Sequence, residues 1–151
     1  MISHRYRTNM PTPLDWPAIL ANHQKDAKDP LLKMFFDRAI TDKDLPLAEV
    51  PFVALDFETT GLDPQADDIV SIGTVPFNLN RVYCQRATHW LVKPRQPLEE
   101  DSVIIHGITH SDILKAPDLR DVLAEVLSSL AGKMVVVHYH RIEREFLDRA
   151  V

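Results

Sequence analysis

The sequence predicts an α/β fold in which a mixed sheet is flanked by helices. Residues 50–57 form an apolar run with the composition of a buried strand, and residues 69–77 add the β-branched residues typical of a second strand. Residues 118–130 place their apolar side chains on one stripe, as an amphipathic helix does, and the apolar segment 134–138 follows. Because a helix separates the two segments, residues 134–138 are expected beside and parallel to residues 50–57.

Residues 1–48 are predicted to be an arm followed by a helical extension of the domain formed by residues 49–151. Residues 1–13 are polar and basic and contain two prolines, so we expect a mobile arm. One helix is expected from Asp15, and a second after the capping residue Asp29. Because short isolated helices are marginal in water, we expect the apolar face of the second helix to pack on the domain or on a partner. That face contains Leu31, Leu32, Met34, Phe35, Phe36 and Ile40.

The segments between these elements predict shorter structures. Residues 82–92 are expected to be a third strand in a hairpin or meander, with Cys84 packed on one of its faces. Residues 99–105 and residues 112–116 are expected to be short helical turns, and a final helix is expected from Arg141. No base lies near the cysteine in the sequence, so it is not predicted to be a nucleophile.

The composition is that of one packed domain of 151 residues, with 45% hydrophobic and 26% charged residues. A net charge of −5 argues against holding nucleic acid by a basic surface alone. The single cysteine cannot form an internal disulfide, which fits a reducing, cytoplasmic location. No apolar run has the length of a membrane span, and no secretory segment follows the polar start, so no membrane association is expected.

Two carboxylates lie at the end of the first predicted strand. Asp56 and Glu58 project on the same side of the strand, because side chains alternate, while Phe57 points away. Paired carboxylates repel each other and recruit a cation, and oxygen ligands of this kind suit magnesium or manganese. Such a pair on its own more often marks a solvated strand end. Here Thr-Thr-Gly-Leu follows, and its glycine can turn the chain and bring backbone N–H groups toward an anion.

The segment 56–62 resembles the first signature motif of the DEDD 3′→5′ exonucleases, the DnaQ-like superfamily that includes the proofreading subunit of bacterial DNA polymerase III. The likeness continues through residues 105–109 and 135–138 and covers about residues 50–151. It implies a ribonuclease H-like fold and a metal-dependent 3′→5′ exonuclease of the DEDDh type that releases nucleoside 5′-monophosphates. It also implies a two-metal site that binds Mg²⁺ or Mn²⁺.

The resemblance also assigns roles to individual residues. Asp56 and Glu58 would be catalytic metal ligands. His106 would contact the 3′-terminal nucleotide, although lone histidines are more often structural or surface residues. Backbone groups that hold this nucleotide would come from Thr59, Thr60, Gly61 and Leu62.

Residues 138–147 resemble the second motif of the superfamily, in which a His-Asn pair ends a strand and a metal-binding Asp follows on the next helix. Aligned on the Phe-Leu pair of this segment, Glu143 fills the ligand position and Tyr139 fills the Asn position. Glu supplies the same oxygens with a longer reach, so Glu143 is predicted to be the third catalytic metal ligand. The alternative is that Glu143 and Glu145 are solvated helix residues beside two arginines.

The third motif of the superfamily, a His followed by an Asp on a later helix, is not present before Val151. That Asp would complete the metal site, and that His would be the general base. We therefore expect the chain to be a C-terminally truncated piece of a longer exonuclease, with a natural short homologue as the alternative. A truncated piece is expected to turn over very slowly and to expose apolar surface that favours a homodimer.

The expected partners are nucleic acids with single-stranded 3′ ends and, through the resemblance, a DNA polymerase. The rival prediction is a catalytically inactive nucleic-acid-binding or protein-assembly module with the same fold. It is motivated by the absent third motif and by the Tyr139 and Glu143 departures from the second.

Overall fold

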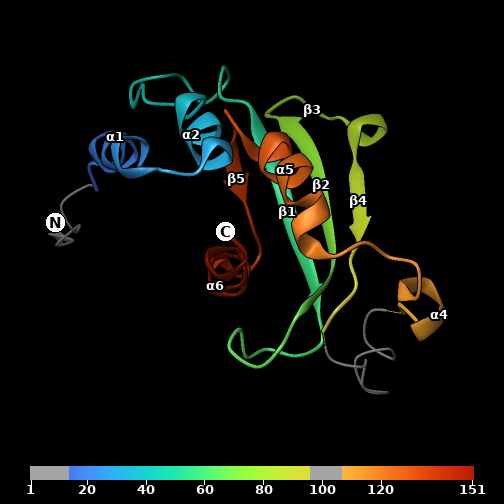
Figure 1. Ribbon diagram of the computed structural model, residues 1–151. Coiled ribbons are helices and arrows are strands. Elements are labelled where there is room, and N and C mark those ends of the chain that lie inside the picture. The colour runs from blue at the N-terminus through green and yellow to red at the C-terminus, as the bar shows by residue number, and fades with distance from the viewer. Residues whose placement is uncertain (1–13, 96–106) are drawn as a thin grey trace, which may run out of the picture.

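The computed structural model describes residues 14–95 and 107–151, and its centre is one mixed five-stranded sheet (Figure 1). The strand order is β3-β2-β1-β5, and β4 pairs with β2 outside this path. The strands are β1 (Phe52–Thr59), β2 (Ile69–Asn78), β3 (Arg81–Val82), β4 (Thr88–Leu91) and β5 (Met134–Val136). β1 is antiparallel to β2 and parallel to β5, so the predicted parallel neighbour of the first strand is confirmed.

Five α-helices are present in the described residues, and four of them begin after an Asp or Thr capping residue. They are α1 (Trp16–Asp26), α2 (Pro30–Asp37), α4 (His110–Ile113), α5 (Leu119–Leu130) and α6 (His140–Ala150). The side chain of Asp29 accepts hydrogen bonds from the first N–H groups of α2, and Asp118 does the same for α5. In the described residues, no helix combines the length and apolar character needed to cross a membrane.

One face of the sheet carries the core. Every second residue of β1, namely Val53, Leu55 and Phe57, is buried. These side chains pack with the apolar stripe of α5 and with Phe146 of α6. Figure 1 shows α5 lying across the front of the sheet, with α6 beside its lower end. The opposite face of β1 carries Phe52, Ala54, Asp56 and Glu58.

The N-terminal extension packs on this core through α2. Phe35 lies against the core cluster, and α2 contacts α5. α1 contains no buried residue and contacts α2, to which the Gln24 amide is tied by a 2.7 Å hydrogen bond with Asp37. The expected packing of the second helix on the domain is therefore observed.

The predicted single strand over residues 82–92 is wrong, because a 3₁₀ turn, η1 (Cys84–Arg86), separates β3 from β4. Pro76 of β2 faces this gap. Its carbonyl accepts a hydrogen bond from Tyr83 at 2.9 Å, but a proline has no N–H with which to continue the ladder on that edge. The chain therefore turns away, and Cys84 is exposed where packing was expected. The short helix predicted over residues 99–105 lies outside the described residues.

Candidate active site

The carboxylates of β1 occupy the face of the sheet opposite the core. Asp56 is exposed and Glu58 is half-buried, while Phe57 between them is buried on the other face. The predicted common direction of the two carboxylates is therefore observed. Across the strand pair, Asp56 lies opposite Gly73 and Glu58 lies opposite Ser71. Both cross-strand neighbours are small, and Ser71 is only 3% exposed.

A register shift follows the second carboxylate. The ladder between β1 and β2 is irregular between Glu58 and Thr59. Irregularities of this kind bend a strand and redirect its side chains. The Thr59 hydroxyl donates a 2.6 Å hydrogen bond to the carbonyl of Gly61, which folds the chain into the loop of residues 60–68. We call this segment the motif loop.

Gly61 is needed for space and not for a left-handed backbone. The chain bends at residues 60–62, as the sequence predicts, but the φ of Gly61 is not positive. A Cβ atom at Gly61 would instead lie 2.6 Å from Cγ of Asp67. That carboxylate accepts hydrogen bonds from the Thr60 hydroxyl at 3.2 Å and from the Asp63 N–H at 2.9 Å. Gly61 thus lets the motif loop close around a fixed carboxylate.

Glu143 lies on the inward face of α6, the helix that packs against β1 and α5. Its side chain is only 6% exposed, and its Oε2 atom has no hydrogen-bond partner in the described structure. A buried polar atom without a partner costs free energy, so this oxygen requires a donor or a cation. Glu145 differs, since its side chain is 41% exposed and paired with Arg141 at 2.9 Å. The solvated-helix alternative therefore describes Glu145 but not Glu143.

The donor set fits a hard divalent cation, because all three predicted ligands are carboxylates and one carboxylate oxygen is buried and unpaired. The positions of the three carboxylates fit a shared cation less well than their chemistry does. Within residues 14–95 and 107–151, no three His, Cys, Asp or Glu side chains lie close enough together to hold a metal ion. The structure thus places Asp56 and Glu58 on one face and Glu143 on the adjacent helix, without bringing all three to one point.

The remaining predicted residues have mixed outcomes. His106 lies outside the described residues. Leu62 of the motif loop is 79% exposed, which leaves an apolar side chain free to contact a ligand. A capping box holds the start of α4. In it the Thr109 side chain accepts a hydrogen bond from the Asp112 N–H, and the Asp112 side chain accepts one from the Thr109 N–H. Hydrogen bonds from Thr109 hold the pKa of Asp112 below its ordinary value of 3.8.

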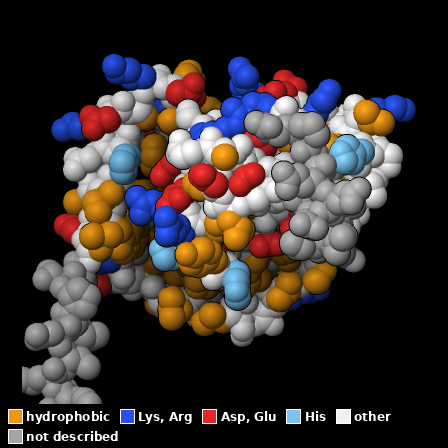
Figure 2. Space-filling view, turned by 90° about the horizontal axis from the view of Figure 1, so that it is seen from below, with side chains coloured by type: hydrophobic (Ala, Val, Ile, Leu, Met, Phe, Trp, Pro, Cys, Tyr) orange, Lys and Arg blue, Asp and Glu red, His pale blue; other side chains and the backbone are white. Residues whose placement is uncertain are grey.

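Figure 2 shows the molecule from the lower end of the sheet, where the motif loop lies. Acidic and basic side chains gather side by side near the middle of this face, and apolar side chains gather along its lower part. This face thus carries charges of both signs, in a chain whose overall net charge is −5. A ligand with phosphate groups would therefore meet local cations here and not a continuous basic surface.

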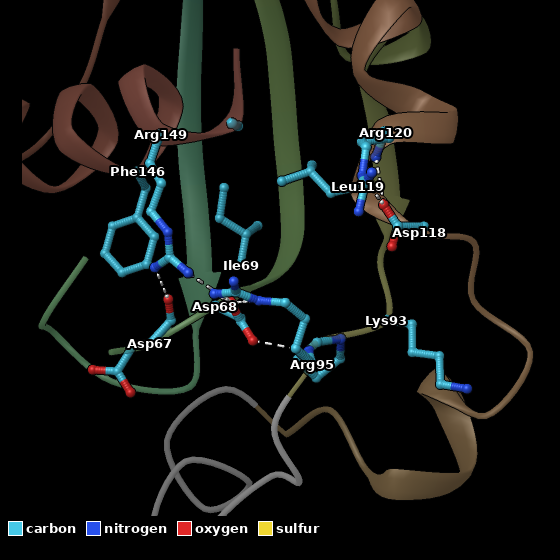
Figure 3. A pocket seen from close by; sticks show the side chains of 12 residues that line it. Asp67, Asp68, Ile69, Lys93, Arg95, Asp118, Leu119, Arg120, Phe146 and Arg149 are labelled. Atoms are coloured by element: carbon cyan, nitrogen blue, oxygen red, sulfur yellow. Dashed lines mark hydrogen bonds and ion pairs between the residues drawn. The ribbon is translucent and has the colours of Figure 1, made fainter. Parts of the chain in front are cut away.

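Sequence reasoning missed a group of ion pairs beside the motif loop (Figure 3). They border a pocket of about 330 Å³ between the loop, the start of α5 and the end of α6. Asp68 accepts hydrogen bonds at 2.8 Å from both the backbone N–H and the Nε–H of Arg95, and Arg149 of α6 reaches the same carboxylate. These residues are far apart in the sequence, so no periodicity or short motif could have paired them.

The fold and the carboxylates together define a class of protein. A mixed five-stranded sheet flanked by helices, with two carboxylates that project together from its central strand, is the arrangement that the sequence predicted for a ribonuclease H-like domain. Residues 53–150 match the model of the RNase_T family, whose description is Exonuclease. The chain belongs to this exonuclease family, and the DnaQ-like resemblance of its motifs is confirmed.

Individual relatives agree with this assignment. A PolC-type DNA polymerase III of Thermotoga maritima is 36% identical over 104 residues, which are 69% of this chain and 8% of that protein. The DNA polymerase III subunit epsilon of Haemophilus influenzae is 29% identical over 101 residues, 64% of this chain and 39% of that protein. The chain thus spans less than half the length of either relative.

Solved structures show the same fold. Exonuclease X in complex with 5′ overhanging duplex DNA superposes with a TM-score of 0.54 at 25% identity, over 64% of this chain and 53% of that one. Product-bound exonuclease I has a TM-score of 0.60 at 18% identity, over 67% of this chain and 25% of that one. The second likeness concerns the fold alone.

Proposed function

We propose that this domain belongs to a metal-dependent 3′→5′ exonuclease that releases nucleoside 5′-monophosphates from nucleic acid ends. The observation that carries the proposal is the buried, unpaired Oε2 of Glu143 on a helix that packs against β1. β1 presents two further carboxylates, and the chain belongs to the exonuclease family. In such a chain, a buried carboxylate without a partner is best explained as one half of a cation site.

Asp56, Glu58 and Glu143 would hold Mg²⁺ or Mn²⁺. When bound, ions of this kind polarise a phosphate and lower the pKa of a water molecule. The protein supplies the oxygen ligands, and the burial of Glu143, which is 6% exposed, restricts the access of water to that residue. Because two ligands come from a strand and one from a helix, cation binding would draw the two elements together.

The motif loop would position the terminal nucleotide. Thr59, Thr60 and Gly61 follow Glu58 directly in the chain, so their backbone groups lie close to that residue. The exposed side chain of Leu62 offers an apolar surface to a base. His106 is proposed to contact the same nucleotide. Single-stranded 3′ ends are the proposed substrate, because the DEDD exonucleases that the motifs resemble accept an unpaired terminus.

Two associations are part of the proposal. Relatives named as DNA polymerase III proteins support association with a polymerase. Self-association is proposed through the sheet face opposite the core, where exposed apolar side chains include Met134 and Val136, each 42% exposed. Exposed apolar patches favour contact with another molecule.

The rival candidate is a catalytically inactive module that binds nucleic acid or assembles with other proteins. It is favoured by one observation, namely that the three carboxylates do not form a cluster able to hold a metal in the described structure. The two candidates make opposite predictions for the loss of a carboxylate on β1.

The test is the stepwise shortening of a 5′-labelled single strand, together with the release of 5′-mononucleotides from a 3′-labelled strand, with Mg²⁺ or Mn²⁺, using this chain and any longer product of the same gene. Asp56→Ala is expected to lower the rate by more than about 100-fold, since changes beside a metal ligand already cost about 10–100-fold. Glu145→Ala is the matched control, because Glu145 is an exposed carboxylate of α6 and is expected to leave the rate unchanged. Equal rates for Asp56→Ala and the unmodified protein would support the rival.

A further inference from the structure

The last turn of α6 is bound to the motif loop by one side chain. The Nη1 group of Arg149 donates to the carbonyl of Pro64 and, at 2.9 Å, to the carbonyl of Asp67. Its Nη2 atom lies 3.6 Å from the carboxylate of Asp68. The Arg149 side chain is only 28% exposed, whereas that of Arg144 on the same helix is 77% exposed. Arg149 is therefore an inward-facing contact of α6 and not one of its solvated charges.

Asp68 connects this contact to the beginning of the motif loop. Its side chain is 10% exposed and also receives the hydrogen bonds from Arg95. Its backbone exchanges two hydrogen bonds with Thr60: the Thr60 N–H donates to the Asp68 carbonyl at 2.9 Å, and the Asp68 N–H donates to the Thr60 hydroxyl at 3.0 Å. Figure 3 shows Arg149 and Arg95 approaching Asp68 from opposite sides. The path from α6 to the end of β1 thus passes from Arg149 through its ion pair with Asp68 to the hydrogen bonds between Asp68 and Thr60.

Glu143 lies six positions before Arg149 on the same helix, or about 9 Å along its axis at 1.5 Å per residue. A helix moves as a rigid unit over this length, so fixing its last turn also limits where Glu143 can lie relative to β1. We infer that Arg149, through the motif loop and Asp68, is a positioning residue that sets the separation of Glu143 from Asp56 and Glu58. This inference rests on the proposed function, because that separation matters only if the carboxylates share a cation.

The chemistry of the contact explains why an arginine serves here. A planar guanidinium presents several N–H groups in a fixed fork, so it can bond two carbonyls and a carboxylate at once. A lysine ammonium at the same position would keep the charge but not the fork. Exposed ion pairs contribute little to stability. The ion pair of Arg149 with Asp68 is partly buried, and the same guanidinium also donates hydrogen bonds to two backbone carbonyls. Losing it should release both the loop and the helix end.

The experiment measures Mn²⁺ binding to the 151-residue chain by titration calorimetry and by electron paramagnetic resonance of free Mn²⁺, well below the unfolding temperature of each variant. Arg149→Ala is expected to bind Mn²⁺ about tenfold more weakly, the lower end of the effect of groups that orient metal ligands. Arg149→Lys is expected to lie between this variant and the unmodified chain. Arg144→Ala is the matched control, because its side chain is 77% exposed and pairs with Asp148 on the same helix, and it is expected to bind normally.

A purely structural role would lower the unfolding temperature of Arg149→Ala and leave its Mn²⁺ affinity unchanged, and that result would overturn the inference. If Arg149→Ala does not fold, Arg149→Lys decides, and normal affinity in that variant overturns the inference equally. Asp56→Ala separates the two proposals. If it binds Mn²⁺ as well as the unmodified chain does, the proposed cation site is wrong. If it does not and Arg149→Ala does, only the positioning role is wrong.

Discussion

The two faces of β1 differ in what they contribute to the protein. On the covered face, Val53, Leu55 and Phe57 pack under α5 and α6 and form the centre of the core. On the open face, the same strand carries Asp56 and Glu58, which no helix of the described residues buries. Because strand side chains alternate, one sequence of eight residues supplies stability on one side and ligands on the other. A change at one position is therefore expected to affect either folding or chemistry.

The open face is itself divided along its length. At the end away from the carboxylates, the rings of Phe52 and Phe77 stack with centroids 5.2 Å apart, and Met134 is exposed on the adjacent β5. Toward the other end, Gly73 and Ser71 lie opposite the carboxylates. The face thus passes from an apolar part to an acidic part. The apolar part suits association with a protein surface, and the acidic part suits a cation.

The largest expected effect is on the covered face. Phe57→Ala removes a ring that is 8% exposed and packed in the core, and such changes cost about 3–5 kcal/mol. Chemical denaturation followed by circular dichroism measures the loss. Asp56→Ala, one residue earlier and on the open face, is expected to change the free energy of unfolding by less than about 0.5 kcal/mol. Similar losses in both variants would contradict the division between the faces.

Glu143 is a buried carboxylate on α6, the helix that packs against β1. Glu143→Met replaces it by an apolar side chain of similar size. In EDTA, we expect the free energy of unfolding to rise by about 1–3 kcal/mol, since an unsatisfied buried oxygen is removed. In Mn²⁺, the unmodified chain should gain stability and the variant should not.

The control for this prediction is Glu145→Met, two positions along the same helix. Glu145 is exposed and paired with Arg141, so its replacement should change stability by less than about 0.5 kcal/mol with or without Mn²⁺. A destabilised Glu143→Met variant in EDTA would mean that the carboxylate already has a partner in the metal-free protein.

The apolar part of the open face predicts a concentration-dependent dimer. Light scattering after size-exclusion chromatography should show a mass above that of the 17.2 kDa chain, and Phe77→Glu should restore the monomer. Leu114→Glu is the control, because Leu114 is 71% exposed on a different part of the molecule. A monomer at all concentrations would show that the open face does not bind a second copy.

The smallest expected effect is the pH dependence of the capping box before α4. The pKa of Asp112 is lowered by its hydrogen bonds to Thr109, so its folded value is below its unfolded value. Its stabilising contribution is therefore present above the ordinary pKa of 3.8 and is lost as the pH falls through the lower folded value. Unfolding of the unmodified chain and of Asp112→Asn, compared from about pH 5 to about pH 2, should converge at the acid end. A constant difference across this range would contradict the assignment.

Much of this fold could be predicted because local patterns determine it. The alternation in residues 50–57 correctly placed Asp56 and Glu58 on one face, and the stripe of residues 118–130 correctly gave α5. The third strand could not be predicted correctly. Its interruption depends on Pro76 of the neighbouring strand, which strand composition alone does not reveal.

The candidate site was predictable to a smaller extent. The position of Glu143 came from the motif order, but its burial did not, since the arginines around it suggest a solvated helix. The contact between Arg149 and the motif loop joins residues 82 positions apart and depends on how α6 docks on the sheet. Such contacts are properties of the packed structure, and no local spacing encodes them.

The most direct test of the central claim is a crystal of this protein soaked in Mn²⁺, with anomalous scattering used to locate the ion. We expect a Mn²⁺ ion bound by the carboxylates of Asp56 and Glu143, with Glu58 beside it, and with α6 drawn toward β1. A Mn²⁺ ion found only at exposed carboxylates such as Asp63 or Glu145, or no bound ion at all, would contradict the claim that β1 and α6 together form a cation site.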